Sequence, residues 1–492
     1  MIPVKHKNLL QAWLALTLSI LLFYPLFATL YDNDIILQWR IQNSLELTAA
    51  VALFVLLLTG ALWLIDKISN TIIRCVLFFL MFIIPFISFF IHFLQQLGFK
   101  NALITFGQYA HGHRFLVATI GAFCGALFLL LVIRYPRKMI YALIMVLLAL
   151  SPLNLLAGWT LWNVRNENTK IVINVPDLYE KKAKTPTHNL IVLLFDELSY
   201  EYLYKDGSIN RQYVKFHRLS SISDNYHAAT SPGNETLTAI PGMLMGRRYE
   251  NIVMKYDTIY RITKDNKEEY LKIEPDNLFA IAKDKGYSTF AYGTYLPYCE
   301  MFEQYLDGCR SFSIYNYGNV ETQFSLLNPI MTTLIIWPRL GPQGFIKNMA
   351  ASQWQRRQTE QVFHLTLKTL DEKAPVFMFS HIYIPHLPFV FNRNGYYDNN
   401  EPFLQNSENY QRQLEYADHL LGKVISKMEE KGIFESSEII VLSDHNYRIM
   451  FAGRENHIPL IIKTPYQKIR RDRFEPAHAE YLLKRGLSLS GL

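Results

Sequence analysis

The stretch Asn189-Leu-Ile-Val-Leu-Leu-Phe195-Asp196-Glu197 decides the fold: six apolar residues, two of them β-branched, lead directly into two carboxylates. Apolar on both faces, it is typical of a central strand in a helix-covered parallel sheet. The acids then lie at the carboxyl end of the strand, where open α/β sheets bind ligands. A capping role for Asp196 at a helix that begins near Leu198 is the structural alternative. Three segments that are distant in sequence favour a ligand-binding role over the capping role, because each offers partners for the same site.

The first 162 residues predict a membrane domain. Half of the 492 residues are hydrophobic and 14% are aromatic, and the enrichment is concentrated before about Trp162. Five apolar runs each approach the roughly twenty residues that cross a bilayer. They are Leu9–Leu30, Leu45–Ile65, Ile72–Phe93, Phe115–Ile133 and Met139–Trp162. The first run is too long for a removable signal peptide and lacks its small-residue cleavage site. Buried core helices are the alternative, which five nearly charge-free runs disfavour.

The orientation follows from lysine and arginine in the short loops. These residues precede the first run, separate the second from the third, and separate the fourth from the fifth. They are Lys5, Lys7, Lys67, Arg74, Arg134, Arg137 and Lys138. The N-terminus is therefore expected in the cytoplasm, and five spans place everything after Trp162 on the other side.

Residues 163–188 are polar and contain Pro176 and Pro186, which predicts a linker into a soluble domain of residues 189–492. There, β-rich runs alternate with helical stretches, which predicts a mostly parallel sheet with helices on both faces. The expected strands include Ile191–Phe195, Ser288–Tyr292, Val376–Ser380, Ile439–Leu442 and Pro459–Ile462, and the expected helices Asp276–Lys285, Gln353–Leu370 and Tyr410–Lys431. The net charge of +7 is spread without a long basic block, so no nucleic-acid partner is expected.

The segment Thr230-Ser-Pro-Gly-Asn-Glu-Thr236-Leu-Thr-Ala-Ile-Pro-Gly242 places a hydroxyl at an expected helix start. With Asn234 as the cap, Thr236 lies in the first turn, where free backbone N–H groups favour phosphate or developing negative charge. A hydroxyl there acts as a nucleophile if a divalent cation stabilises its alkoxide. A threonine that satisfies its own helix start is the structural alternative.

Two other strand-like runs end in residues that bind metals or phosphate. The run from Val376 to His381 is followed by His386 between two prolines, which suits a substrate or metal contact. The run from Ile439 ends in Asp444 and His445, both good ligands for zinc or manganese. Each alone also fits a turn or core residue. Together with Asp196, these strand ends are expected to converge at one edge of one sheet.

The motifs resemble those of the alkaline phosphatase and sulfatase superfamily, over nearly the whole chain. The resemblance is greatest to the membrane-anchored branch that contains lipid A phosphoethanolamine transferases and lipoteichoic acid synthases. It implies an alkaline-phosphatase-like α/β/α sandwich behind five spans of a bacterial inner membrane, with the catalytic domain in the periplasm. It implies Thr236 as the nucleophile, a metal site of Asp196, Thr236, Asp444 and His445, and substrate contacts by His381 and His386. Glu197 and Asn234 are further expected substrate contacts.

One divalent ion, zinc or manganese, is expected. His457 is the candidate for a further histidine ligand, so a second metal is kept as an alternative. The chain departs from phosphoethanolamine transferases at Pro232 and Gly242, where cysteines are usual, and at Asn446, where a glycine is common. It also lacks the C/S-x-P-x-R motif from which sulfatases form formylglycine.

The resemblance therefore implies transfer of a substituted phosphate, of phosphoethanolamine or phosphoglycerol type. The donor is expected to be a membrane phospholipid and the acceptor an envelope glycan or lipid. Hydrolysis of a phosphodiester or sulfate ester, and a non-catalytic lipid-binding regulator, are the alternatives.

The chain has four cysteines. Cys75 and Cys124 lie in apolar runs and are expected to pack as small hydrophobes. Cys299 and Cys309 lie close together in a polar, aromatic segment. A local disulfide in an oxidising compartment and two free thiols are both compatible with this spacing.

Overall fold

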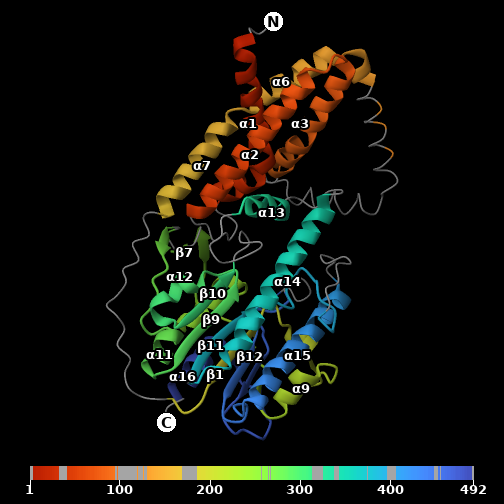
Figure 1. The fold of residues 1–492 in the computed structure, drawn as a ribbon. Helices are drawn as coiled ribbons and strands as arrows, with labels where there is room; N and C mark the ends of the chain where they lie inside the picture. The colour runs from red at the N-terminus through yellow and green to blue at the C-terminus, as the bar shows by residue number, and fades with distance from the viewer. Residues whose placement is uncertain are drawn as a thin grey trace. The chain divides into compact units, whose positions relative to one another are not determined.

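The computed structural model describes residues 4–32, 41–94, 130–168, 186–255, 258–263, 267–312, 325–336, 343–373, 375–395, 406–447 and 456–489, with isolated positions between them. The chain forms two compact units (Figure 1). The first contains Met1–Ile35, Trp39–Val172 and Asn319–Ala350, and the second contains Ile36–Gln38, Ile173–Gly318 and Ala351–Leu492. The segment Asn319–Ala350, which the sequence analysis places in the soluble domain, thus packs with the N-terminal helices.

The first unit holds the apolar helices. They are α1 (Val4–Asp32), α2 (Ile41–Asp66), α3 (Thr71–Leu94), α6 (Pro136–Leu150) and α7 (Leu153–Asn168). In the part of the chain that the structure describes, four segments are long and apolar enough to cross a membrane: Lys7–Ala28, Asn43–Asp66, Thr71–Leu94 and Pro136–Trp162. They correspond to four of the five predicted runs, and the remaining run, Phe115–Ile133, lies largely outside the described residues. A turn at Ser151 and Pro152 separates α6 from α7, because proline cannot donate the backbone hydrogen bond of a continuing helix.

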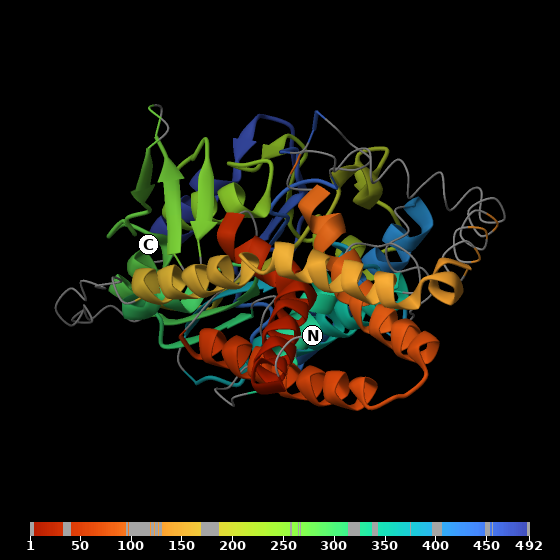
Figure 2. The ribbon, with the colours of Figure 1, turned by 90° about the horizontal axis from the view of Figure 1, so that it is seen from above.

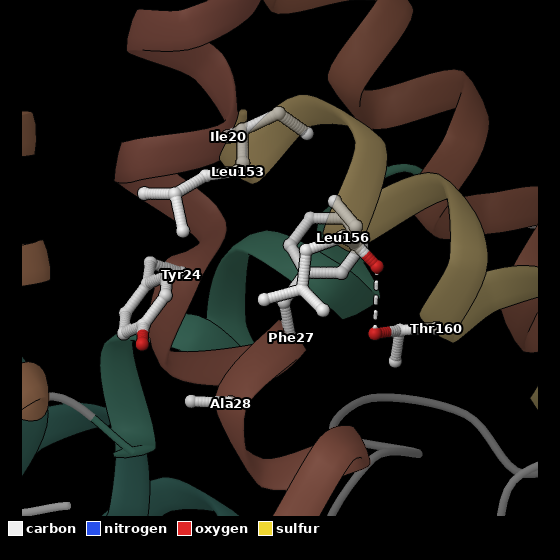
Figure 3. A pocket seen from close by; sticks show the side chains of 8 residues that line it. Ile20, Tyr24, Phe27, Ala28, Leu153, Leu156 and Thr160 are labelled. Atoms are coloured by element: carbon white, nitrogen blue, oxygen red, sulfur yellow. Dashed lines mark hydrogen bonds between the residues drawn. The ribbon is translucent and has the colours of Figure 1, made fainter. Parts of the chain in front are cut away.

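Helix α1 contacts α2, α3, α6 and α7 (Figure 2). The shared apolar core is made by leucines of α1 and phenylalanines of α3, among other residues; it includes Leu14, Leu18, Leu21, Phe78, Phe82, Phe89, Leu143 and Leu147. An apolar cavity of about 140 Å³ lies between α1 and α7 (Figure 3). Its wall includes Tyr24 of α1 and Thr160 of α7, whose hydroxyl donates to the Leu156 carbonyl at 2.9 Å.

Helix α13 (Leu327–Ile336) packs against α1 and α2, which explains why its segment belongs to the first unit. The buried carboxylate of Glu46 in α2 accepts a hydrogen bond from the Ser325 amide at 3.0 Å. It also accepts from the Asn328 side chain at 3.2 and 3.3 Å. A buried carboxylate that receives several donors holds the start of α13 on the N-terminal apolar helices.

The second unit is built on an eight-stranded sheet with the order β10-β9-β11-β1-β12-β13-β4-β14. Strands β10, β9, β11, β1 and β12 are parallel, β13 is antiparallel to both neighbours, and β14 is parallel to β4. The strands are β1 (Leu190–Phe195), β4 (Asp224–Tyr226), β9 (Ser288–Thr294), β10 (Gly308–Phe312), β11 (Val376–Ile382), β12 (Glu438–Leu442), β13 (Leu460–Lys463) and β14 (Arg471–Arg473). The predicted fold class is confirmed, and all five predicted strands are present within two residues at each end.

Helices cover both faces of this sheet (Figure 1). Alternate residues of β1 point to opposite faces: Leu190, Val192 and Leu194 pack in the core that includes α10, α11 and α16. On the other face, Phe195 packs edge-on against Phe216 of α9, with ring centroids 5.6 Å apart. The helices of this unit are α8 (Tyr200–Leu203), α9 (Val214–Ser220), α10 (Thr236–Met245), α11 (Leu278–Asp284), α12 (Tyr298–Phe302), α15 (Ser407–Glu430) and α16 (Ala479–Leu489), with a 3-10 turn at Glu303–Tyr305. Helix α14 (Gln343–Thr369) begins in the first unit and belongs to the second from Ala351 onward.

Smaller sheets complete the second unit. They are the pair β2 (Tyr204–Lys205) and β3 (Ser208–Ile209), the pair β5 (Ala229–Thr230) and β15 (Ala477–His478), and the three-stranded sheet of β6 (Ile252–Lys255), β7 (Thr258–Ile262) and β8 (Glu268–Tyr270).

Candidate active site

The candidate site lies where the three central strands end. β1 pairs in parallel with β11 on one side and with β12 on the other, so that Leu194 lies opposite both His381 and Leu442. Since parallel strands present their carboxyl ends at the same edge, the residues that follow them meet there. The convergence expected from the sequence is what the structure shows.

Asp196, Asp444 and His445 form a group that could hold a metal ion. Their ligand atoms all lie within 4.8 Å of one another, and all three side chains are fully buried. The Oδ1 atom of Asp196 is buried without a hydrogen-bond partner. His445 Nδ1 lies 2.9 Å from the Asn446 carbonyl and donates to it, which leaves the Nε2 lone pair facing Asp444 Oδ2 at 3.3 Å. Acceptors that face one another in a buried site fit a cation, and this ligand set suits zinc or manganese.

Thr236 reaches this group from the first residue of α10. Its hydroxyl donates to Asp444 Oδ2 at 2.7 Å and lies 3.3 Å from His445 Nε2. The hydroxyl of Thr238, two residues along the same helix, donates instead to the Glu235 carbonyl at 3.1 Å. The structure therefore distinguishes the two threonines: Thr236 faces the metal-binding group, whereas Thr238 is hydrogen-bonded to the N-cap carbonyl of its own helix.

Both capping hypotheses of the sequence analysis need correction. The N-cap of α10 is Glu235, whose extended backbone places its carbonyl to accept from Thr238 and Ala239 N–H, while Asn234 is exposed one residue earlier. The N-cap of α8 is Ser199, whose hydroxyl accepts from the Tyr202 amide at 3.4 Å. Asp196 is therefore no cap, and its carboxylate stays at the sheet edge.

Asp444 is oriented by backbone donors. Its Oδ1 accepts from the amides of Glu197 at 3.1 Å and His445 at 2.8 Å. Glu197 has a φ of 60°, a left-handed conformation that is uncommon for this residue type and that clusters at functional sites. The Tyr410 hydroxyl donates to the Glu197 carbonyl at 2.7 Å and so supports this turn.

Electrostatic interactions shift the pKa values of Asp196 and His386 in opposite directions. Burial raises the pKa of Asp196, but the positive charge of His386 and the hydrogen bond from His381 outweigh it and lower the pKa to about 2. Burial lowers the pKa of His386, but the charges of Glu197 and Asp196 outweigh it and raise the pKa above its usual value. Opposite charges that stabilise each other in a buried site produce such paired shifts.

The two histidines predicted to contact substrate have different surroundings. His381 is fully buried; its Nε2 donates to Asp196 Oδ2 at 3.1 Å and its Nδ1 accepts from the Tyr298 hydroxyl at 2.8 Å. Both ring nitrogens of His381 are thus used in hydrogen bonds within the protein. His386 is partly exposed, and its Nδ1 donates to the Leu387 carbonyl at 2.6 Å, which leaves Nε2 as the ring atom available to a phosphate.

His457, the candidate for a second metal, lies in a different network. Its Nδ1 is 3.2 Å from Glu201 Oε1, and its Nε2 donates to the His227 carbonyl at 3.0 Å. Glu201 also accepts from the Asn446 side chain at 2.8 Å. Within the described residues, the metal group consists of Asp196, Asp444 and His445 alone, so the one-metal expectation is the better supported.

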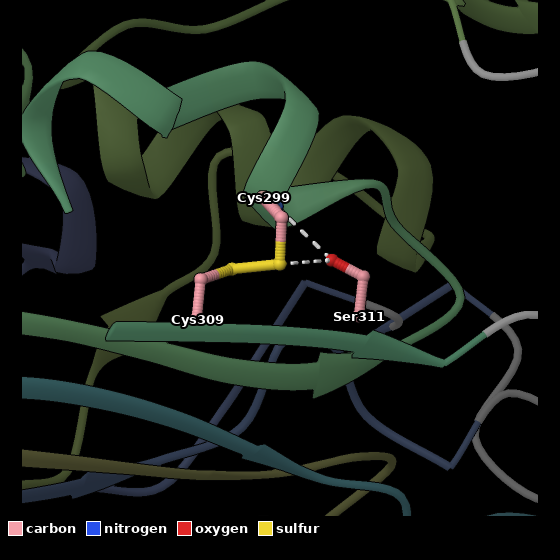
Figure 4. The surroundings of a disulfide bond; sticks show 3 residues. All are labelled: Cys299, Cys309 and Ser311. Atoms are coloured by element: carbon pink, nitrogen blue, oxygen red, sulfur yellow. Dashed lines mark hydrogen bonds between the residues drawn. A yellow bond between two sulfur atoms is a disulfide. The ribbon is translucent and has the colours of Figure 1, made fainter. Parts of the chain in front are cut away.

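Sequence reasoning missed several supporting residues. Glu201, Tyr298, Tyr410 and Gln413 follow no strand end and belong to no motif, so no local signal marks them. The structure also joins Cys299 of α12 to Cys309 of β10 by a disulfide, with Cα atoms 5.5 Å apart (Figure 4). This pairing selects one of the two alternatives that the sequence leaves open.

Comparison with known proteins gives a family match. The family model named sulfatase matches residues 188–489, whereas no curated protein sequence matches the chain. Similar solved structures include lipoteichoic acid synthase LtaP from Listeria monocytogenes, 13% identical, covering 67% of this chain and 78% of that chain with a TM-score of 0.40. A phosphonate monoester hydrolase of Agrobacterium radiobacter is 13% identical, covering 62% of this chain and 74% of that chain with a TM-score of 0.39. An alkaline phosphatase superfamily protein from Vibrio parahaemolyticus is 17% identical, covering 67% of this chain and 74% of that chain with a TM-score of 0.38.

Proposed function

This chain belongs to the sulfatase family, and on that premise we propose that it is a membrane-bound, metal-dependent transferase of a substituted phosphate. The donor is a membrane phospholipid, and the acceptor is a hydroxyl of an envelope glycan or lipid. The observation that carries the proposal is the Thr236 hydroxyl, which donates to Asp444 beside His445 and Asp196.

Asp196, Asp444 and His445, with Thr236 as a fourth ligand, would hold one divalent ion. When bound, the ion supplies positive charge that stabilises the Thr236 alkoxide and the phosphate oxygens. The protein's own part is to fix the geometry. The 2.7 Å hydrogen bond directs the hydroxyl proton of Thr236 toward Asp444 Oδ2.

The first half-reaction loads the enzyme. Thr236 Oγ1 attacks the phosphorus of the headgroup phosphodiester, an Oγ–P bond forms, and the bond from phosphorus to the diacylglycerol oxygen breaks. The leaving oxygen takes a proton. His386 is the donor that we assign, because the charges of Glu197 and Asp196 raise its pKa, which favours the protonated ring, and its Nε2 is not used by the Leu387 carbonyl.

The second half-reaction transfers the phosphate group from Thr236 to the acceptor. The acceptor hydroxyl attacks the phosphorus, its oxygen forms the new P–O bond, and the Oγ–P bond breaks. The acceptor hydroxyl gives its proton to His386, which restores the donor of the first half-reaction. Thr236 takes back the proton that Asp444 Oδ2 accepted, so no further reactant is needed. Transfer to water by the same steps would be the hydrolase alternative.

Two sequence features support this choice within the family. The nucleophile segment contains no cysteine and no arginine in the C/S-x-P-x-R arrangement, which speaks against sulfate-ester hydrolysis through formylglycine. The four membrane-crossing candidates in the described part of the chain fit a donor that is itself a lipid. The periplasmic location of the catalytic domain is part of the proposal.

The test uses the full chain in proteoliposomes that contain phosphatidylethanolamine or phosphatidylglycerol, with Mn²⁺ or Zn²⁺. We expect diacylglycerol release and a headgroup-phosphate adduct on Thr236, seen by mass spectrometry of the digested protein. Thr236→Ala should remove the adduct and lower turnover by about 10³-fold or more, as loss of a covalent nucleophile does.

Thr238→Ala is the matched control. It removes a neighbouring hydroxyl whose hydrogen bond only closes the helix start, so turnover should stay within a few-fold. Near-normal turnover of Thr236→Ala, or an adduct on Ser231, would refute the assignment of the nucleophile. Release of the free headgroup phosphate with no acceptor product, when an acceptor is present, would favour the hydrolase.

A further inference from the structure

A chain of buried hydrogen bonds connects the metal group to a tyrosine outside it. The Tyr298 hydroxyl donates to His381 Nδ1 at 2.8 Å, and His381 Nε2 donates to Asp196 Oδ2 at 3.1 Å. All three side chains are fully buried. Because a carboxylate can only accept, Nε2 of His381 carries a proton, and in the neutral ring Nδ1 is then the acceptor for the tyrosine hydroxyl.

The backbone makes room for this arrangement at Gly293 in β9. A Cβ atom there would lie 2.5 Å from Tyr298 Cε2 and 2.9 Å from His381 Cβ, closer than real contacts allow. The ring of Tyr298 also packs at a tilt against Phe379 of β11, with centroids 5.9 Å apart. Strands β9 and β11 of the sheet therefore form the space that the Tyr298 ring occupies.

The helix that carries Tyr298 is fastened beside it. Cys299, the next residue, is joined to Cys309 of β10 by the disulfide. The Cys299 amide also donates to the Ser311 hydroxyl at 3.0 Å (Figure 4). Two separate links thus fix the start of α12 to the edge strand of the sheet.

We propose that Tyr298 is a positioning residue of the metal centre: through His381 it fixes Asp196 with Oδ2 turned to the protein and Oδ1 left for the cation. The inference rests on the metal-dependent function proposed above. It assigns to Tyr298, His381 and the disulfide a role in metal affinity, whereas His386 faces the substrate.

The physical reason lies in how a carboxylate ligand is held. Asp196 Oδ1 is buried without a hydrogen-bond partner, whereas Oδ2 is held by His381. Without the tyrosine hydroxyl, Nδ1 of His381 loses its donor in a site closed to water. The ring then has no fixed orientation or proton position. Loss of such an outer partner costs about 10- to 100-fold in metal affinity.

The test measures Mn²⁺ and Zn²⁺ binding to the metal-free full chain in detergent by calorimetry. Tyr298→Phe keeps the ring and removes only the hydroxyl, and we expect a dissociation constant about 10- to 100-fold higher. Tyr292→Phe is the control, since it removes the hydroxyl of another buried tyrosine that is hydrogen-bonded, in this case to the Thr369 hydroxyl at 2.7 Å. Its metal affinity should equal that of the unaltered chain.

A second variant tests whether the disulfide between α12 and β10 contributes to metal affinity. Cys299→Ala with Cys309→Ala should weaken metal binding in the same direction but by less, because Ser311 still holds the Cys299 amide. Thermal unfolding of each metal-free variant separates positioning from folding: Tyr298→Phe should unfold close to the Tyr292→Phe control, because each variant loses one buried hydrogen bond.

The outcomes separate this inference from the proposed function. If the unaltered chain binds Mn²⁺ or Zn²⁺ and Tyr298→Phe binds it equally well, the positioning role is refuted while the metal centre stands. If the unaltered chain binds neither ion, both are refuted. Weaker binding by Tyr298→Phe that only parallels a loss of metal-free stability would also refute it.

Discussion

At the scale of single residues, the candidate site is a set of acceptors buried against one another. Asp196, Asp444 and His445 each offer a ligand atom within 4.8 Å of the others, and the Thr236 hydroxyl donates to Asp444 Oδ2. Burying an ionised group without compensation costs several kcal/mol. A bound cation removes that cost, and at 100 times its dissociation constant it would stabilise the folded chain by about 2.7 kcal/mol.

The pair Glu201–His457 gives a pH-dependent prediction at this scale. The hydrogen bond to Glu201 raises the pKa of His457, so the charged ring is favoured in the folded chain. This stabilisation is complete below the unfolded histidine pKa of about 6.5 and is lost as pH rises through the raised folded value. His457→Gln should therefore cost about 1 kcal/mol more in unfolding free energy at pH 6 than at pH 8.5.

Denaturant unfolding of the metal-free full chain in detergent, followed by fluorescence at both pH values, measures this difference. His217→Gln, on α9, is the control and should show a smaller pH dependence. An equal cost of His457→Gln at both pH values would contradict the pairing.

At the scale of elements, α15 positions the loop that carries His386. Gln413 of α15 is fully buried. Its Oε1 accepts from the Val390 amide at 2.8 Å and the Phe391 amide at 3.3 Å, and its Nε2 donates to the His386 carbonyl at 2.7 Å. Gln355 of α14 donates to the same His386 carbonyl at 3.3 Å. One side chain from each of two helices thus holds this loop by hydrogen bonds.

We therefore predict that Gln413→Leu lowers stability and weakens substrate binding together. Buried amides and carbonyls that lose their partner cost about 1–3 kcal/mol, and His386 moves relative to the metal group. Thermal unfolding should show the loss, and kinetics with a lipid donor should show a KM raised by about 10-fold, the factor that 1.4 kcal/mol of binding energy represents. Gln411→Leu, two residues earlier on the same helix, should change neither; a Gln413→Leu enzyme that behaves like it would refute the role.

At the scale of the whole molecule, the chain passes between its two units more than once. It leaves the first unit after Val172, returns at Asn319 and leaves again after Ala350. Within the first unit, the Glu46 carboxylate accepts hydrogen bonds from the Ser325 amide and the Asn328 side chain, and these bonds hold the start of α13. The second unit therefore contains chain on both sides of Asn319–Ala350, a segment that belongs with the N-terminal apolar helices.

The number of spans gives a prediction at this scale. Four described segments can cross a membrane, and the predicted run Phe115–Ile133 would make a fifth. With five spans and a cytoplasmic N-terminus, a reporter that is active only outside the cytoplasm should give signal after Leu492. The same reporter after Ile68, between the second and third spans, should be silent. Signal after Ile68, or silence after Leu492, would overturn this topology.

The sequence by itself determined the features that local patterns encode. Strands that are apolar on both faces can only lie inside a helix-covered parallel sheet, so the carboxyl ends of β1, β11 and β12 had to meet. Asp196, Asp444 and His445 could therefore be grouped before any coordinates. The Pro-Gly turn before Thr236 placed that hydroxyl at a helix start, and the length of the apolar runs predicted the membrane helices.

Only the tertiary structure decided which partner each polar group has. Tyr298 and His381 are 83 residues apart and Glu201 and His457 are 256 apart, and neither pair has a spacing that sequence could recognise. Glu46 and Asn328 are separated by 282 residues, so the place of α13 among the membrane helices could not be read from its composition. Such contacts depend on how elements pack, because a buried donor takes whichever acceptor the fold brings within reach.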